Sequence, residues 1–320
     1  MVRSSGTEDY KEAEQKLEAL KGAKGLWVVD VATRFFEEHE MSDKTRKCYQ
    51  TSLRNWQPFV ENLTMNQITL DVVRKFVDAR LKADRPNDGE RIKPSTIRSD
   101  LAFMSSMFGW ATMLPNGPQT NVISLFRKRT LKPSPARIRW LTQPQVRDLL
   151  AAIDTDSHRL IALVGLEAGL RKSEILTLKA HHIVPEQDGN GYYILIEGGN
   201  AKSKKGRRVP VSSTLSRTLI PHVRTLKPGA YVFPNPQVLG KEVPYKDVRP
   251  WWPDALAKAG IEDFTFHDTR HHFASWYVQR GGRLQPLMEL LGHHSLAMVL
   301  KYASLGPGDS TREFRSLERT

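Results

Sequence analysis

The chain has 320 residues and carries 48 Lys and Arg residues against 35 Asp and Glu residues, which gives a formal net charge of +13 at pH 7. It contains no run of 18 apolar residues and no basic-then-apolar leader, so we expect neither a membrane span nor secretion. Its single cysteine, Cys48, excludes an internal disulfide and a cysteine-rich zinc cluster.

The excess of positive charge favours a polyanionic partner, because each phosphate that Lys or Arg neutralises releases condensed counterions. Nucleic acid is expected ahead of an anionic membrane surface, since no basic amphipathic helix with an aromatic face is present. A basic protein whose charges are merely solvated is the plain alternative. Together with the lone cysteine, these features predict a cytoplasmic, nucleoid-associated protein.

Residues 26–114 are predicted to form a small all-helical domain, preceded by an N-terminal extension over residues 1–25. Apolar side chains in this region recur at steps of three and four residues, which is the spacing of one helix face. Ser42 is placed to cap the second of the helices. The four apolar stripes are Val28, Val31, Ala32 and Phe35; Tyr49, Leu53, Trp56 and Val60; Val72, Val73, Phe76, Val77 and Leu81; and Ile97, Leu101, Met104, Phe108 and Ala111.

Residues 115–137 combine Pro, Gly and a run of three basic residues, which indicates a basic linker. Residues 138–305 are predicted to form a larger α+β domain, followed by a C-terminal tail over residues 306–320. Two short β-type runs in this domain, residues 192–197 and 208–211, are predicted to pair as a hairpin. The expected fold is therefore mainly α with a small β-hairpin or sheet.

Six polar side chains of the larger domain suit the attack of a tyrosine on a phosphodiester. A phenol is neutral at pH 7, since its pKa is about 10, so it needs a base or nearby positive charge to lose its proton. Fixed Arg and His donors can bind the charge that develops on the non-bridging oxygens, and a Lys or His can protonate the leaving oxygen. The six are Arg171, Lys202, His267, Arg270, His293 and Tyr302.

The local spacing of these residues favours one site. Glu174 follows Arg171 by three residues and can reach back over the same helical turn to support it. His267 and Arg270 share a helix face by the same spacing, and Gly292 is placed to end a helix just before His293. Taken singly, each of these patterns is more often a surface pair or a helix boundary, so the order of the whole set carries the interpretation.

The chain resembles the tyrosine recombinases, also called the phage integrase family. Four segments are similar to the family's catalytic motifs, and a fifth is similar to its lysine-bearing β-hairpin. The helical segment of residues 95–111 is similar to the end of the family's core-binding domain. The five segments are residues 169–175, 267–275, 291–295, 301–303 and 201–211.

The resemblance implies a role for each of the six side chains. Tyr302 would be the nucleophile that forms a 3′-phosphotyrosyl link, and Lys202 would protonate the leaving 5′ oxygen. His267 would act as the base toward the phenol. Arg171, Arg270 and His293 would bind the non-bridging oxygens of the scissile phosphate. The chain departs from the family's usual pattern at Thr269, where Leu is more common, and at His272, where Thr is more common.

A site-specific DNA recombinase of a prophage or mobile element is therefore the leading functional hypothesis. The covalent intermediate conserves the phosphodiester energy, so no metal, ATP or other cofactor is expected, and no P-loop pattern or paired Asp cluster is present. A chromosome-dimer resolvase and a type IB topoisomerase would use nearly the same residues. A zinc hydrolase using His267, His271 and His272 is disfavoured because an arginine stands between the ligands. A non-catalytic DNA-binding regulator does not explain the six polar groups.

Double-stranded recombination sites are the expected partner. The family resemblance implies a homotetramer on DNA, a monomer being possible off DNA, and an accessory DNA-bending protein is a further candidate. Residues 3–14 resemble the end of an arm-site-binding domain. Seven basic residues near predicted helix starts or on the hairpin are candidate DNA contacts, namely Lys44, Arg46, Lys47, Arg98, Lys204, Lys205 and Arg207.

Overall fold

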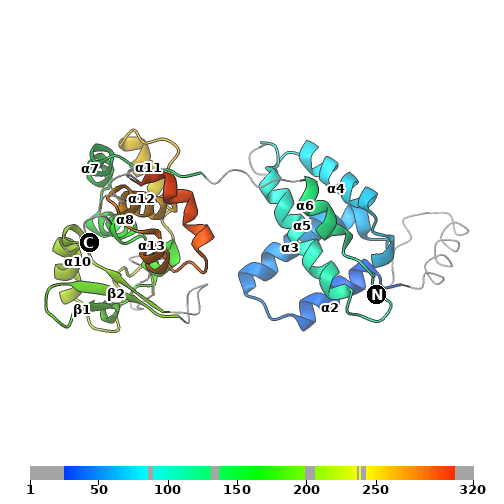
Figure 1. Cartoon of the computed structure of the whole chain (residues 1–320), viewed down its shortest axis with the longest axis horizontal. Coiled ribbons are helices and arrows are strands. Elements are labelled where there is room, and N and C mark those ends of the chain that lie inside the picture. The colour runs from blue at the N-terminus through cyan, green and yellow to red at the C-terminus, as the bar shows by residue number, and fades with distance from the viewer. Residues whose placement is uncertain are drawn as a thin grey trace, which may run out of the picture. The chain divides into compact units, whose positions relative to one another are not determined.

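A computed structural model describes residues 25–85, 89–130, 137–198, 206–235, 238 and 243–306. The chain divides into two compact units, the first ending at Pro135 and the second beginning at Ala136 (Figure 1). No helix among the described residues is long and apolar enough to cross a membrane. The predictions for Lys202, Lys204, Lys205, the extension up to residue 24 and the tail after residue 306 lie outside the described residues.

The first unit is helical, and the four helices predicted from its apolar stripes are confirmed. Ser42 caps α3 by accepting a hydrogen bond from the backbone N–H of Thr45 at 3.2 Å. The stripes face one core, in which Trp56 stacks on Phe76 with ring centroids 3.6 Å apart, except that Leu81 at the end of its stripe is exposed. The helices are α2 (Val28–Glu38), α3 (Asp43–Val60), η1 (Met65–Gln67), α4 (Leu70–Lys82), α5 (Pro94–Ala111) and α6 (Val122–Thr130).

Helix α6 corrects the prediction that residues 115–137 form only a linker. Its Ile123 and Phe126 are buried in the core of the first unit, where α6 packs against α5 and α4. The two apolar side chains are three residues apart, so they lie on one helix face despite the basic residues that follow them. The helical unit therefore extends beyond residue 114.

The second unit combines helices with a three-stranded antiparallel sheet of order β1-β2-β3. The predicted hairpin is confirmed, and β1 is an additional strand that the sequence did not predict. Ile183, Ile194 and Val209 lie opposite one another across the three strands and are buried, so this face of the sheet covers the core. The strands are β1 (Ile183–Pro185), β2 (Tyr192–Ile196) and β3 (Arg207–Pro210).

Helix α8 runs through the core of the second unit and packs closely against α12. A Cβ at Gly165 of α8 would lie 2.7 Å from Thr269 Oγ1, so there is little space between the two helices. Thr269 also donates to the Phe266 carbonyl at 2.8 Å, which satisfies its buried hydroxyl. This contact leaves little room for a larger side chain at position 269. The helices are α7 (Gln143–Ala152), α8 (Asp156–Ala168), α9 (Lys172–Leu176), η2 (Ala180–His182), α10 (Ser213–Arg224), α11 (Trp252–Lys258), α12 (Asp268–Gln279), α13 (Leu284–Leu291), η3 (Leu296–Met298) and η4 (Leu300–Leu305).

Candidate active site

The turn between α8 and α9 places Arg171 at the start of a helix. Gly169 ends α8 with φ +61°, a left-handed conformation that glycine adopts without steric cost. A Cβ at this position would lie 2.4 Å from a ring carbon of Phe273, so the close approach of α12 also requires glycine. The chain then reverses, and Arg171 becomes the N-cap residue of α9.

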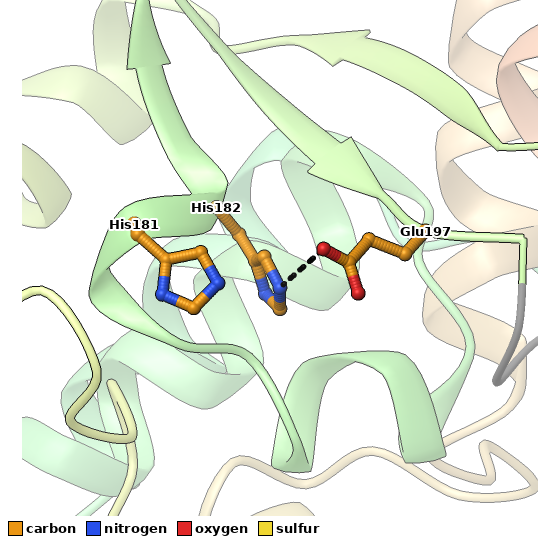
Figure 2. Close-up of side chains that lie close together, drawn as sticks. All are labelled: His181, His182 and Glu197. Carbon is orange, nitrogen blue, oxygen red and sulfur yellow. Dashed lines mark ion pairs between the residues drawn. The ribbon is translucent and has the colours of Figure 1, made fainter.

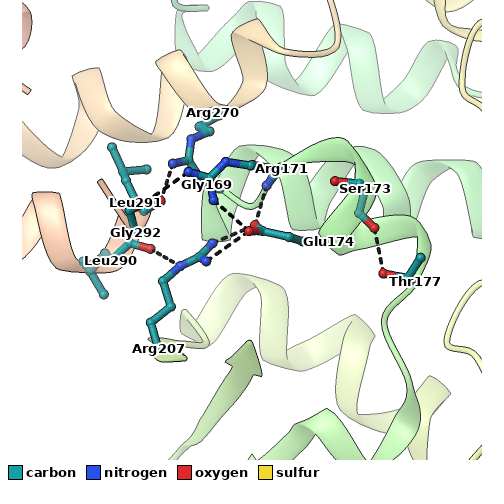
Figure 3. A network of polar contacts seen from close by, with 10 residues as sticks. All are labelled: Gly169, Arg171, Ser173, Glu174, Thr177, Arg207, Arg270, Leu290, Leu291 and Gly292. Atoms are coloured by element: carbon teal, nitrogen blue, oxygen red, sulfur yellow. Dashed lines mark hydrogen bonds and ion pairs between the residues drawn. The ribbon is translucent and has the colours of Figure 1, made fainter. Parts of the chain in front are cut away.

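Glu174 supports Arg171 as the spacing predicts. Its Oε1 accepts from Arg171 Nη1 at 2.9 Å, and its Oε2 accepts from the Arg171 backbone N–H at 2.8 Å (Figure 3). Burial alone would raise the pKa of Glu174, but hydrogen bonds from Arg207 and Arg171 hold it below its usual value. The carboxylate is therefore charged at neutral pH and fixes the orientation of the Arg171 side chain.

Arg270 is anchored close to Arg171 by backbone carbonyls from two different turns. Its Nη1 donates to the Gly169 carbonyl at 2.9 Å and its Nη2 donates to the Leu291 carbonyl, while Arg171 Nη2 reaches the adjacent Gly292 carbonyl at 3.1 Å. Only 4% of Arg270 is exposed. Burial and the neighbouring Arg171 lower its pKa to about 9, so it remains charged at pH 7. The structure thus brings together Arg171 and Arg270, the two arginines that were predicted to bind the scissile phosphate.

His293 follows the turn that both arginines contact. Gly292 ends α13 in the left-handed region at φ +61°, as the sequence predicts. The His293 Nδ1 atom is buried and has no hydrogen-bond partner among the described residues. Burial and then Arg270 lower the pKa of His293 to about 4, so the ring is neutral at pH 7. A neutral ring still carries one N–H that can donate to a phosphate oxygen.

Tyr302 is buried and sits on the 3₁₀-helix η4. Only 1% of the residue is exposed. Its hydroxyl is hydrogen-bonded to His271 Nδ1, and the Lys301 Nζ lies 3.5 Å from that same nitrogen. Burial raises the pKa of the Tyr302 hydroxyl, whereas the charge of Arg270 acts in the opposite direction. The η4 helix that carries Tyr302 packs against α12, the helix that carries Arg270 and His271.

The histidine that contacts Tyr302 is His271, whereas the sequence proposed His267 as the base. His267 lies one turn earlier, at the N-cap of α12, with its ring centroid 5.3 Å from that of His271. Burial and then Lys301 lower the pKa of His271 to about 4. The spacing of four residues from His267 was the signal that could have included His271, because it puts both on one helix face.

The prediction that Arg207 contacts DNA does not fit the structure. Its side chain is only 7% exposed, because it forms a buried ion pair with Glu174 instead of projecting from the hairpin. Among the other candidate DNA contacts, Lys44 and Lys47 are exposed on α3, whereas Arg46 and Arg98 are half-buried. These four remain predictions.

His181, His182 and Glu197 form one group whose ligand atoms have metal-like spacing, all within 4.8 Å of one another (Figure 2). His181 Nδ1 bonds to the Pro228 carbonyl at 2.7 Å, so its Nε2 keeps a free lone pair. His182 Nδ1 instead accepts from the Lys179 N–H at 3.1 Å, so a neutral His182 carries its proton on Nε2, the atom that faces Glu197. A metal would require His182 to give up that bond, and the group fits a metal poorly.

Family models match both units of the chain. A model of the phage integrase family matches residues 139–307, which is more than half of the chain, and a model of the phage integrase N-terminal SAM-like domain matches residues 33–113. The chain belongs to the phage integrase family. Its relatives include the integrase of Salmonella phage P22, 33% identical over 196 residues that cover 58% of this chain and 49% of that protein. The shufflon-specific DNA recombinase of Escherichia coli is 28% identical over 285 residues, which cover 88% of this chain and 67% of that protein.

This phage integrase family member spans about half to two thirds of the length of these curated relatives. Among solved structures, it is similar to the Tn1549 transposon integrase in complex with a circular intermediate DNA, with a TM-score of 0.69, 16% identity, and coverage of 91% of this chain and 98% of that chain. It is also similar to a lambda integrase tetramer bound to a Holliday junction, with a TM-score of 0.67, 16% identity, and coverage of 93% and 82%. At such identities the likeness is one of fold.

Proposed function

We propose that this chain is a site-specific DNA recombinase that cuts and rejoins strands through a 3′-phosphotyrosyl link to Tyr302. The observation that carries the proposal is the convergence of Arg171 and Arg270 on adjacent carbonyls of the turn before His293, with Tyr302 bonded to His271 of the same helix that carries Arg270. Membership of the phage integrase family supports the same reaction.

In the cleavage step, a bond forms between the Tyr302 oxygen and phosphorus while the bond from phosphorus to the 5′ oxygen breaks. The guanidinium groups of Arg171 and Arg270 bind the non-bridging oxygens, whose charge grows in the transition state. His293 supplies one further N–H donor. Lys202, on the segment between β2 and β3, is proposed to protonate the 5′ oxygen as it leaves.

The phenolic proton leaves through His271 and then His267, the N-cap residue of α12. His271 contacts the Tyr302 hydroxyl directly, but with a pKa of about 4 it is a poor final acceptor at neutral pH. His267 is exposed and lies next to His271, so we retain it as the proposed base that carries the proton to solvent. Rejoining reverses these steps with a different 5′ hydroxyl, so the reaction needs neither ATP nor a metal.

Double-stranded DNA is the proposed substrate, and a homotetramer on two DNA sites is the proposed active assembly. Similar structures support this, since one is an integrase on circular intermediate DNA and another is an integrase tetramer on a Holliday junction. Integration or excision of a prophage or mobile element is the proposed biological role, performed at the nucleoid in the cytoplasm. An accessory DNA-bending protein remains a proposal of the same kind.

The experiment that tests the function is covalent capture of DNA. The protein is incubated with a library of nicked random-sequence duplexes, and adducts that survive detergent are recovered and sequenced. We expect an enriched target and a link at Tyr302, and we expect Tyr302→Phe to bind the recovered duplex with unchanged affinity but to form no adduct. An adduct formed by Tyr302→Phe, or no adduct with the parent protein, would contradict the proposal.

A further inference from the structure

Arg207 connects the hairpin to the arginine cluster through three separate hydrogen bonds. It is the first residue of β3, directly after the segment that joins β2 to β3. Its Nη1 and Nη2 donate to the two oxygens of Glu174 at 3.0 and 2.7 Å, and its Nε donates to the Leu290 carbonyl at 2.8 Å (Figure 3). The planar guanidinium group therefore bridges the start of α9 and the end of α13 in one fixed orientation.

The turn after α13 is shaped around this side chain. A Cβ at Gly292 would lie 3.1 Å from Arg207 Nη1 and 3.2 Å from its Cδ, so Arg207 packs directly against the glycine backbone. The carbonyl of this same glycine accepts from Arg171 Nη2, and His293 follows it in the chain. Arg207 thus touches both the carboxylate and the turn that position Arg171.

The charges of Arg171, Glu174 and Arg207 decide how well Arg171 can stabilise negative charge on a phosphate. Glu174 carries one negative charge, and both Arg171 and Arg207 donate to its Oε1 atom. With Arg207 present, the three groups together carry a net charge of +1. Without it, Arg171 and Glu174 would form a neutral pair, and Arg171 would stabilise less well the extra charge that develops on the phosphate in the transition state.

We propose that Arg207 is a positioning residue for the cleavage reaction, which holds Glu174 and the turn at Gly292 so that Arg171 remains free to bind the scissile phosphate. This inference rests on the proposed recombinase function. All three guanidinium nitrogens of Arg207 already donate to protein oxygens, so its main role is to hold those groups rather than to contact DNA directly.

The neighbouring residue of β3 provides a matched control. Arg208 is exposed and lies over the Tyr193 ring, 4.8 Å from its centroid. Successive residues of a strand face opposite sides of the sheet, so Arg208→Gln removes the same charge from the other face. It leaves Arg207 and Glu174 untouched.

The test measures covalent attachment at saturating DNA, using the duplex that the parent protein captures from the random library. The duplex is prepared with either the ordinary phosphate or a methylphosphonate at the cleavage position. Arg207→Gln is expected to slow attachment to the ordinary phosphate by about 10²-fold, since small misplacements of catalytic groups have effects of that size. Its DNA affinity and the rate of Arg208→Gln are expected to match the parent.

The methylphosphonate separates positioning from general instability. It lacks one anionic oxygen, so its cleavage depends less on the charges of Arg171 and Arg270. The ratio of the parent rate to the Arg207→Gln rate is therefore expected to fall toward one. A second variant, Glu174→Gln with Arg207→Gln, removes both buried charges and so avoids an unpaired carboxylate. It is expected to melt like the parent and still cleave ordinary DNA slowly.

Three results would overturn the proposal. The first is that Arg207→Gln slows attachment equally on both substrates. The second is a parental attachment rate in the doubly substituted protein. The third is that Arg207→Gln loses DNA affinity but keeps the parental rate at saturating DNA. The proposed function fails in a different way, because the parent protein itself would then capture no DNA.

Discussion

His272 makes the stability of the second unit depend on pH. The residue is 5% exposed, and its Nδ1 accepts a hydrogen bond from the Leu141 N–H at 3.1 Å. Only a neutral ring can accept this bond, because both nitrogens of a protonated histidine are donors. Burial, followed by the charge of Arg280, lowers the pKa of His272 to about 4. The bond ties α12 to the segment before α7.

The size of the effect follows from the two pKa values. An unfolded histidine titrates near 6.5, so as the pH falls the unfolded chain takes up the proton first. The contribution of neutral His272 to the unfolding free energy is fully present above pH 6.5 and is lost as the pH falls toward 4. Between pH 7 and pH 5, the loss of unfolding free energy from His272 is about 2 kcal/mol. The loss reaches about 3 kcal/mol below pH 4.

Denaturant unfolding of the full chain at pH 7 and pH 5 measures this loss. His272→Asn keeps an oxygen that can accept from Leu141 but cannot titrate, so its stability is expected to change less with pH than that of the parent. Exposed His294→Asn serves as the control and is expected to retain the full pH dependence. The same pH dependence in His272→Asn and in the parent would refute the reasoning.

The parts of the fold that the sequence predicts correctly are those set by short-range patterns. The apolar stripes of α2 to α5 repeat over two or more turns, and Ser42 and Gly292 are local signals of a helix start and a helix end. The contact between Arg171 and Glu174 also spans only three residues. Such patterns are decided by residues that are neighbours in the chain.

The errors arise where a distant partner decides the outcome. Arg207 was assigned to DNA because of the basic residues beside it, but Glu174, 33 residues earlier, draws its side chain into the protein. The hydrogen bond between His271 and Tyr302 joins residues 31 positions apart and depends on how η4 folds back onto α12. In the same way, the buried position of α6 follows from its contacts with α5 and α4, which no local composition reveals.

Two substitutions test the turn between α8 and α9, which contains Gly169 and Arg171. Arg171→Ala is expected to slow covalent attachment roughly 10²–10³-fold while the protein stays folded, and parental cleavage by this variant would remove Arg171 from the site. Glu174 keeps its other buried partner in this variant, so the loss is not attributable to unfolding. Gly169→Ala is expected to lower the unfolding free energy by about 2–4 kcal/mol, because it adds a left-handed strain of about 1 kcal/mol to a forced shift of Phe273. Gly189→Ala is the matched control, since its φ of +74° carries the same backbone strain but no atom lies within 4 Å of the added methyl group. If thermal and denaturant unfolding showed equal losses for the two alanine variants, the close packing of α12 on the turn would not be what requires glycine there.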